Sequence, residues 1–332
     1  MSYGLLKGKR GIISGALDSN SIAWKVAQRA KQEGAIFTLT NAPLAMRMGE
    51  INKLAEECES KIIPADATSV EDLEKLYEGS MDALGGKVDF VLHSIGMSAN
   101  IRKKRPYGDL NYEWFLKSLD VSALSFHKML QVADKMDAIN PEGSVVALSY
   151  IAAQRSFPDY TDMAQAKAML ESIARSYGYV YGKKNGTRVN TVSQSPTKTS
   201  AGTGISGFNA FYEYANQMSP LGNASADECA DYVITLFSDL TKKVTMQNLF
   251  HDGGFSAVGI SEEIVAKMEA KKYVLKLKSH TKIVFVWLFR IVLFQIGANE
   301  PSYFLMFLHQ TRYKIATSQV FVLISKKRYH SS

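Results

Sequence analysis

Short apolar runs alternate with helix-patterned segments through the first 250 residues, and this alternation constrains the fold more than any other feature of the sequence. The runs span four to six residues, as buried strands do, whereas the segments between them repeat apolar residues every three or four positions. Strands that alternate with helices form a parallel sheet with helices on both faces. The predicted strands are Arg10–Ser14, Ile36–Thr40, Lys61–Ala65, Val88–Leu92, Val145–Leu148, Thr187–Val192 and Met246–His251, and the predicted helices are Ser21–Glu33, Ala45–Glu59, Val70–Leu84, Tyr112–Met136, a segment from Thr161 onward and Ser225–Leu240. We therefore predict an α/β fold with one doubly wound parallel sheet.

The residues directly after the first, third and fourth predicted strands are candidate ligand contacts, because ligands bind outside the carboxyl ends of parallel strands. Gly15–Ile22 combines small residues with the start of a helix, which suits a pyrophosphate. The run is not G-x-G-x-x-G, and an ordinary strand-to-helix turn fits it equally well. Asp66–Ala67 suits either an adenine edge or a helix N-cap. His93–Gly96 suits a nicotinamide ribose or a plain turn, and His93 alone reads as a structural histidine.

The stretch after the fifth predicted strand carries Tyr150, Tyr160 and Lys167. The lysine follows the second tyrosine by seven residues, close to two helical turns, so both side chains would project from one helix face about 10 Å apart along the axis. A phenol and an ammonium on one face suit oxyanion stabilisation and proton delivery, whereas the alternative is an ordinary amphipathic helix. Because three candidate ligand loops end at the same sheet edge, we favour a nicotinamide dinucleotide enzyme.

These motifs resemble the short-chain dehydrogenase/reductase superfamily and, within it, the bacterial NADH-dependent enoyl-acyl carrier protein reductases. Most of the superfamily carries Tyr-x-x-x-Lys, but here Met163 stands four residues before Lys167 and Tyr160 stands seven before it, with Tyr150 ten residues earlier. The segments that fit the enoyl reductase branch in the same order are Ser21-Ile22-Ala23, His93-Ser94-Ile95-Gly96, Arg188-Val189-Asn190 and Asp252-Gly253-Gly254-Phe255. The resemblance covers roughly residues 4–262.

The resemblance implies a Rossmann-like domain over residues 4–265. It implies hydride transfer from NADH to the trans-2 double bond of an enoyl-acyl carrier protein thioester, the last step of the fatty acid elongation cycle. It also implies a cytoplasmic homotetramer whose partner is the acidic acyl carrier protein. Arg102–Arg105 and Lys198 are candidates for docking that carrier, although a basic run is more often a solvated loop.

Residue roles follow from the same resemblance. Tyr160 would stabilise the enolate oxygen, Lys167 would hold the nicotinamide ribose, and Tyr150 would line the acyl pocket and assist proton delivery. Thr197–Tyr212 would be a mobile lid over the acyl chain. The implied cofactor-binding residues are Gly15, Ala16, Ser21, Ile22, Asp66, Ala67, Ser94, Ile95, Gly96, Lys167, Pro196, Thr197 and Thr199, and the implied substrate-binding residues are Met97, Ser98, Tyr150, Tyr160 and Phe208.

Two positions depart from the family pattern. Ser195-Pro196-Thr197 replaces Gly-Pro-Ile after the sixth predicted strand, where backbone atoms clamp the nicotinamide amide. Asn41-Ala42 replaces the glutamine common after the second strand, and no acidic residue stands there to hold a ribose 2′-hydroxyl. Arg47 follows a little later. We expect NADH, with NADPH left open.

The composition shifts abruptly near the carboxyl end. The net charge of +7 comes from the residues after Glu269, because eleven Lys and Arg against one acid from Lys271 onward leave the first 270 residues at −3. The main domain therefore gives no electrostatic case for nucleic-acid binding.

Two distant cysteines, Cys58 and Cys229, support neither a disulfide framework nor a zinc site, and no metal is expected. No apolar export signal precedes the first strand.

The extension over residues 266–332 holds the apolar runs Lys282–Ile296, Ser302–His309 and Val320–Ile324. The first is shorter than the roughly twenty residues that span a bilayer. The extension is thus a surface membrane contact, a partner-binding segment, or read-through sequence without a selected function. We favour the third because cap signals are absent.

Three rival hypotheses make different predictions. A carbonyl reductase of the same superfamily needs Tyr-x-x-x-Lys and a serine about a dozen residues before the tyrosine, but Met163 and Ala147 stand near those places. A non-catalytic dinucleotide-binding protein would lack Tyr160 or Lys167, and both are present. A membrane-associated protein would contact the membrane through the extension, so the full chain would differ in solubility from a chain that ends near Lys271.

Overall fold

Six parallel strands form one sheet at the centre of the computed structural model, which describes residues 2–203 and 207–271. The strands are β1 (Arg10–Ser14), β2 (Ile36–Thr40), β3 (Val88–His93), β4 (Ile139–Ser149), β5 (Arg188–Gln194) and β6 (Asn248–His251). Their order across the sheet is β2-β1-β3-β4-β5-β6, and every neighbouring pair is parallel. The predicted α/β fold with a doubly wound parallel sheet is confirmed.

The direction of winding reverses between β1 and β3. The chain leaves β1 to form β2 on one side, then returns past β1 to place β3 on the other side. Such a switch point separates the loops that follow the two central strands and makes room for a ligand at the carboxyl ends. The loops after β1 and β3 are therefore the first place to look for a site.

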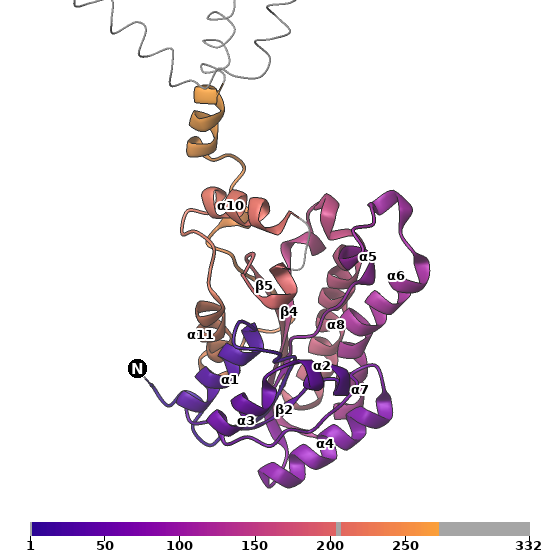
Figure 1. Cartoon of the computed structure of the whole chain (residues 1–332). Coiled ribbons are helices and arrows are strands. Elements are labelled where there is room, and N and C mark those ends of the chain that lie inside the picture. Colours follow the sequence, from indigo (N-terminus) through magenta and orange to yellow (C-terminus); the bar gives the residue numbers. More distant parts are fainter. Residues whose placement is uncertain (1, 204–206, 272–332) are drawn as a thin grey trace, which may run out of the picture. The chain divides into compact units, whose positions relative to one another are not determined.

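Helices cover both faces of the sheet (Figure 1). They are α1 (Ile22–Gln32), α2 (Pro43–Met48), α3 (Ile51–Cys58), α4 (Val70–Leu84), α5 (Ala99–Arg102), α6 (Tyr112–Leu119), α7 (Ser125–Lys135), α8 (Thr161–Asn185), α9 (Ser200–Thr203), α10 (Phe208–Met218) and α11 (Ala226–Phe237). A π-helical turn, η2 (Asp120–Leu124), joins α6 to α7, and the 3₁₀ turns are η1 (Tyr107–Asp109), η3 (Ile151–Ala153), η4 (Pro158–Tyr160), η5 (Asp239–Thr241) and η6 (Phe255–Ala257).

Alternate residues of each central strand serve the two cores. In β4, Val145 and Ala147 pack with α4, α7 and α8, whereas Val146 and Leu148 pack with α1, α3 and α11. Successive side chains of a strand point to opposite faces, so a run of apolar residues is what a strand covered on both sides requires. This explains why the strands read as continuous apolar runs.

Three predicted elements differ from those observed. Lys61–Ala65 is not a strand: only Ile62 pairs with Leu39, at the outer side of β2. Pro64 has no N–H with which to extend the ladder. The helix predicted over Ala45–Glu59 breaks at the extended Gly49, and a Cβ there would lie 2.5 Å from the Leu17 carbonyl oxygen. The helix predicted over Tyr112–Met136 contains the π-turn η2.

The described residues include no helix with the length and apolarity needed to cross a membrane. The apolar runs predicted after Lys282 lie outside the described residues. Residues 1–264 form one compact unit. The boundary that we expect at residue 265 stays a prediction.

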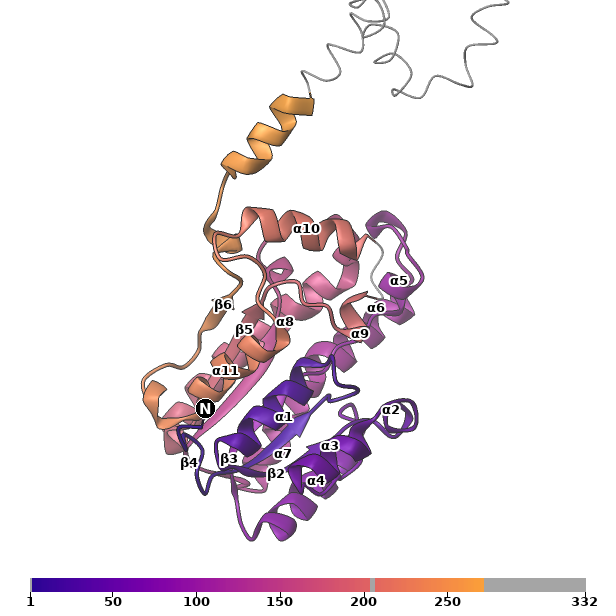
Figure 2. The ribbon, with the colours of Figure 1, turned by 60° about the vertical axis from the view of Figure 1, so that its left-hand side comes forward.

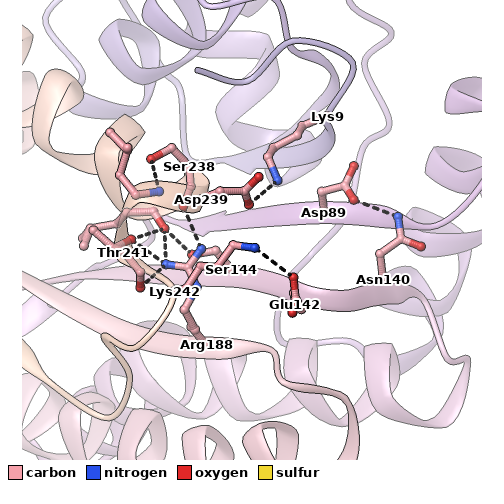
Figure 3. A network of polar contacts seen from close by, with 12 residues as sticks. Lys9, Asp89, Asn140, Glu142, Ser144, Arg188, Ser238, Asp239, Thr241 and Lys242 are labelled. Atoms are coloured by element: carbon pink, nitrogen blue, oxygen red, sulfur yellow. Dashed lines mark hydrogen bonds and ion pairs between the residues drawn. The ribbon is translucent and has the colours of Figure 1, made fainter. Parts of the chain in front are cut away.

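Arg188 joins the start of β5 to the end of α11 (Figure 3). Its guanidinium donates to the carbonyl oxygens of Leu236 at 2.7 Å and Ser238 at 3.0 Å, and to Thr241 Oγ1 at 2.6 Å. The carbonyls at a helix end have no partner within the helix, so a buried guanidinium satisfies them. Arg188 lies at the amino end of its strand, away from the carboxyl edge, so this part of the Arg188-Val189-Asn190 segment is structural.

Replacing Arg188 with methionine should therefore lower the free energy of unfolding by about 2–4 kcal/mol, because buried carbonyls lose their donor. Chemical denaturation measures the change. Lys242→Met is the matched control, since Lys242 in the same network only makes an exposed ion pair with Glu142 at 3.4 Å and should cost less than about 0.5 kcal/mol. Equal losses in the two variants would contradict the role of Arg188.

Candidate active site

The loops after β1 and β3 touch at Gly15. A Cβ at this position would lie 1.9 Å from the Ser94 carbonyl oxygen, and Gly15 has a φ of +90°. Only glycine combines that backbone with so close an approach. Ser14 Oγ donates to the Leu92 carbonyl at 2.7 Å and fixes the two strand ends beneath the contact. The structure thus brings together Gly15 and Ser94, which lie in two of the predicted cofactor-binding loops, while the cofactor contacts themselves stay predictions.

The start of α1 has no side-chain cap. Ser21 Oγ turns back into the loop and accepts from the backbone N–H groups of Leu17 and Asp18 at 3.2 and 3.1 Å. The first turn of α1 also carries no acidic residue. An uncapped helix amino end attracts an anion through its N–H groups and its dipole. Ser21 and Ile22 therefore lie where a pyrophosphate would be held.

Asn41 supports this loop from the end of β2. Its Nδ2 donates to the Ala16 carbonyl at 2.9 Å, and its Oδ1 accepts from the Ala42 N–H at 2.9 Å. The residue that departs from the family glutamine thus braces the loop after β1.

Asp66 forms a turn of its own. Its carboxylate accepts from the N–H and hydroxyl of Thr68 at 2.9 and 2.8 Å. It does not cap α4, because Ser69 does so by accepting from the Asp72 N–H. The N-cap alternative is therefore wrong for Asp66, while the adenine contact of Asp66 and Ala67 stays a prediction.

His93 is structural. The ring is buried, its Nε2 lies 2.8 Å from Ser125 Oγ, and it packs against Phe126. Burial and, to a lesser degree, the charge of Lys167 lower the pKa of His93 to about 3. The imidazole is therefore neutral near pH 7, as the sequence led us to expect of a structural histidine.

Tyr150 and Tyr160 lie ring against ring, with centroids 4.8 Å apart. Tyr160 does not belong to the helix: it ends η4 and occupies the N-cap position of α8, which begins at Thr161. The prediction that Tyr160 and Lys167 project from one helix is wrong in this respect. The cause is the backbone of Thr161, whose φ of +35° turns the chain just after Tyr160.

Lys167 is buried in the second turn of α8 and donates to the Leu148 carbonyl at 2.7 Å. Burial lowers the pKa of its ammonium to about 8, against an opposing effect of the Glu171 carboxylate. A Cβ on Gly96 would lie 3.8 Å from Lys167 Nζ. The segment after β3 therefore runs directly against the face of α8 that carries the lysine.

Burial raises the pKa of both tyrosines, and the neighbouring Tyr160 raises that of Tyr150 further. Both phenols are therefore protonated near neutral pH and able to donate. Two neighbouring neutral phenols can stabilise an oxygen on which negative charge develops.

An aromatic cluster that sequence reasoning missed surrounds the tyrosines. Phe157 and Phe211 lie with ring centroids 5.6 and 6.5 Å from Tyr150 and 5.2 Å from each other. Phe255 contacts both at 6.5 and 6.3 Å. Phe208 lies against Tyr212 with ring centroids 5.9 Å apart, and its predicted contact with substrate stays a prediction. If residues 208–218 form a helix, Phe208 and Phe211 lie next to each other on its surface. This spacing is the sequence signal from which part of the cluster could have been predicted.

The segment after β5 lies at the same end of the sheet as α5 (Figure 2). Thr197 Oγ1 accepts from Gln194 Nε2 at 3.1 Å, and Thr199 Oγ1 accepts from the Gly202 N–H at 3.0 Å. The predicted lid over Thr197–Tyr212 contains α9 and the start of α10, with residues 204–206 outside the described part. Its mobility stays a prediction.

The two candidate docking regions differ. Lys198 stacks its ammonium over Tyr212 at 4.4 Å. Arg105 pairs with Asp109 and lies over Trp114, while Arg102, Lys103 and Lys104 are exposed. Their contact with a carrier stays a prediction.

Residues 15–256 match the family model described as enoyl-(acyl carrier protein) reductase. The chain belongs to this family. The NADH enoyl-acyl carrier protein reductase FabI of Rickettsia bellii is 35% identical over 269 residues, which cover 80% of this chain and 100% of the relative. A second such NADH reductase, from Rhizobium meliloti, is 32% identical over 259 residues, covering 77% of this chain and 93% of the relative.

Solved structures of the family share this fold. The crystal structure of the FabI–NADH complex from Alistipes finegoldii is 63% identical, with a TM-score of 0.77, and covers 78% of this chain and 92% of that one. The NADH reductase from Aquifex aeolicus is 29% identical with a TM-score of 0.71 and covers 77% of this chain and 99% of its own. The resemblance to the enoyl reductase branch is thereby confirmed.

Proposed function

We propose that this protein reduces the trans-2 double bond of an enoyl-acyl carrier protein thioester with hydride from NADH, the last step of the fatty acid elongation cycle. The observation that carries the proposal is the pair of neutral phenols, Tyr150 and Tyr160, whose ring centroids lie 4.8 Å apart at the start of α8, the helix that also carries the buried Lys167. Family membership supports the same reaction, because the relatives are named as NADH enoyl-acyl carrier protein reductases.

The described residues fit a nicotinamide dinucleotide. The uncapped start of α1, with Ser21 and Ile22, suits the pyrophosphate, and the loops that meet at Gly15 leave no side chain over it. Ser94–Gly96 runs beside Lys167, where the nicotinamide ribose would be held. NADH supplies the hydride when it is bound. Further contacts through Asp66, Ala67, Pro196, Thr197 and Thr199 belong to the same proposal.

The chain's own residues stabilise the charge that the reaction creates. Hydride arrival at the β-carbon moves negative charge to the thioester oxygen, and the Tyr160 hydroxyl donates to that oxygen. Within the described residues neither tyrosine hydroxyl has a hydrogen-bond partner, so both remain available to substrate. The ammonium of Lys167 fixes the ribose and adds positive potential. Tyr150 borders the acyl chain and assists protonation.

The acyl chain would contact the apolar surface formed by Tyr150 and the aromatic cluster of Phe157, Phe211 and Phe255. Met97 and Ser98, which follow the nicotinamide segment, and Phe208 complete the proposed substrate contacts. Arg102–Arg105 and Lys198 are the proposed docking residues for the acidic carrier. The homotetramer and the cytoplasmic location that the resemblance implies stay predictions.

The direct test follows NADH oxidation with crotonyl and longer enoyl thioesters. Tyr160→Phe should lower kcat by about 10²–10³-fold, since the oxyanion loses its donor. Lys167→Met should lower both the affinity for NADH and kcat. Tyr179→Phe is the control, because Tyr179 is a tyrosine of α8 that is 60% exposed and should leave kcat unchanged. No oxidation with any enoyl thioester, together with turnover of a ketone, would overturn the proposal.

The pH dependence should report Lys167. Its pKa is lowered to about 8, so the ammonium is the main form below that pH and is lost above it. The value of kcat/KM should be flat below pH 8 and should fall about tenfold per pH unit well above it. Glu171→Gln removes the charge that opposes the lowering, so the fall should move to lower pH. Glu74→Gln, on the exposed side of α4, should leave the profile in place, and an unmoved Glu171→Gln profile would contradict this assignment.

A further inference from the structure

Asp162, two residues after Tyr160, is a fully buried carboxylate with no part in the proposed chemistry. Four side-chain donors surround it. Oδ1 accepts from Ser98 Oγ at 2.6 Å and from Thr161 Oγ1 at 3.0 Å, while Oδ2 accepts from Ser118 Oγ at 2.7 Å and from Asn100 Nδ2 at 2.9 Å. A buried charge is stable only when it is hydrogen-bonded in this way, and its place in the first turn of α8 adds the favourable helix dipole.

The donors come from the segments that face α8. Ser98 caps α5, Asn100 lies within α5, and Ser118 lies in α6. Asn100 also fixes the start of α6, because its Oδ1 accepts from the Asn111 N–H at 3.0 Å. Asp162 therefore joins the beginning of α8 to the whole connection between β3 and α6.

This connection begins with Ser94–Gly96, the proposed nicotinamide segment, and then runs along the first turns of α8. Gly96 lies against Lys167, as its distances show. Met97 is held next, since Ser122 Oγ of the π-turn η2 accepts from its N–H at 3.0 Å and lies 3.2 Å from its carbonyl oxygen. Ser98 then reaches Asp162. The segment is thus anchored to α8 at one end beside the lysine and at the other beside Tyr160.

Thr161, between Tyr160 and Asp162, has a strained backbone. Its φ of +35° and ψ of −127° are unfavourable for a β-branched residue. Strain of this kind persists only where the surroundings hold the residue in place. Here Thr161 Oγ1 donates to Asp162, and Asp162 is held by three further donors. The direction of Tyr160 depends on that turn.

We propose that Asp162 is a positioning residue for the reduction: its carboxylate holds the strained turn at Thr161 and the Ser98 anchor together, and so sets Tyr160 against the Gly96–Ser98 segment. The proposal rests on the proposed function, because it assigns Asp162 through Tyr160. Replacing one carboxylate oxygen by an amide NH2 removes the acceptor of two of the four donors, lets Thr161 relax and moves the Tyr160 hydroxyl away from the oxygen it must stabilise.

The test compares Asp162→Asn with Glu33→Gln by steady-state kinetics and thermal melting of the full chain. Glu33 is a matched control because it is another fully buried carboxylate, accepting from the N–H groups of Tyr3 and Leu5, at the far end of α1. Asp162→Asn should lower kcat by about 10–100-fold with KM for NADH and thioester within about threefold, since Tyr160 acts on charge that develops in the transition state. Glu33→Gln should lower the melting temperature and leave kcat at 20 °C unchanged.

Ser118→Ala tests the same claim if Asp162→Asn does not fold. It removes one donor of Asp162 and should lower kcat by about 3–10-fold with unchanged KM. A crystal structure of the Asp162→Asn variant should show Thr161 with a negative φ. If both variants keep the wild-type kcat while melting earlier, Asp162 is only a stabilising residue and the inference is overturned.

The wild-type assay separates the two hypotheses. If the wild-type chain does not reduce any enoyl thioester, the proposed function itself is contradicted. Normal wild-type reduction with unaltered kcat in Asp162→Asn sinks only the positioning role.

Discussion

The contact between Gly15 and the Ser94 carbonyl is the constraint on which the rest of the site depends. It forms at the switch point, where the loops after β1 and β3 must pass each other without a side chain between them. With these loops in place, the uncapped start of α1 lies on one side and the Ser94–Ser98 segment crosses α8 on the other. The positions of the proposed anion and ribose contacts then depend on this single backbone approach.

The two proposed catalytic side chains, Lys167 and Tyr160, are held in place in different ways. Lys167 is fixed within a regular helix, buried against the Leu148 carbonyl. Tyr160 precedes that helix, and we propose that the strained turn at Thr161 and the hydrogen bonds of Asp162 set its direction. Because Tyr160 precedes the first residue of α8, the seven-residue gap to Lys167 includes the turn at Thr161 as well as the helix.

Much of the architecture was predictable, because apolar runs and helical periods are local signals. The parallel sheet, the loops at Gly15 and Ser94 and the neighbourhood of Tyr150, Tyr160 and Lys167 could be placed from residue spacing and family resemblance. A local signal also explains why the strand predicted over Lys61–Ala65 does not form, since Pro64 has no N–H to donate to a strand ladder.

The remaining features depend on contacts between distant segments. Asp162 reads as an exposed acid at a helix start, and only the fold shows that Ser98, Asn100 and Ser118 converge on it. The π-turn at Ser122, the positive φ of Thr161 and the packing of Phe157 on Phe211 are likewise set by tertiary neighbours rather than by local propensity.

The central claim is that this arrangement directs hydride to a carbon–carbon double bond rather than to a carbonyl. NADH labelled with deuterium at nicotinamide C4, supplied with an equal mixture of crotonyl and acetoacetyl thioesters, tests it in one measurement by mass spectrometry and NMR of the products. The account predicts butyryl thioester with deuterium on the β-carbon and unreacted acetoacetyl thioester. Deuterated 3-hydroxybutyryl thioester beside unreacted crotonyl thioester would contradict it.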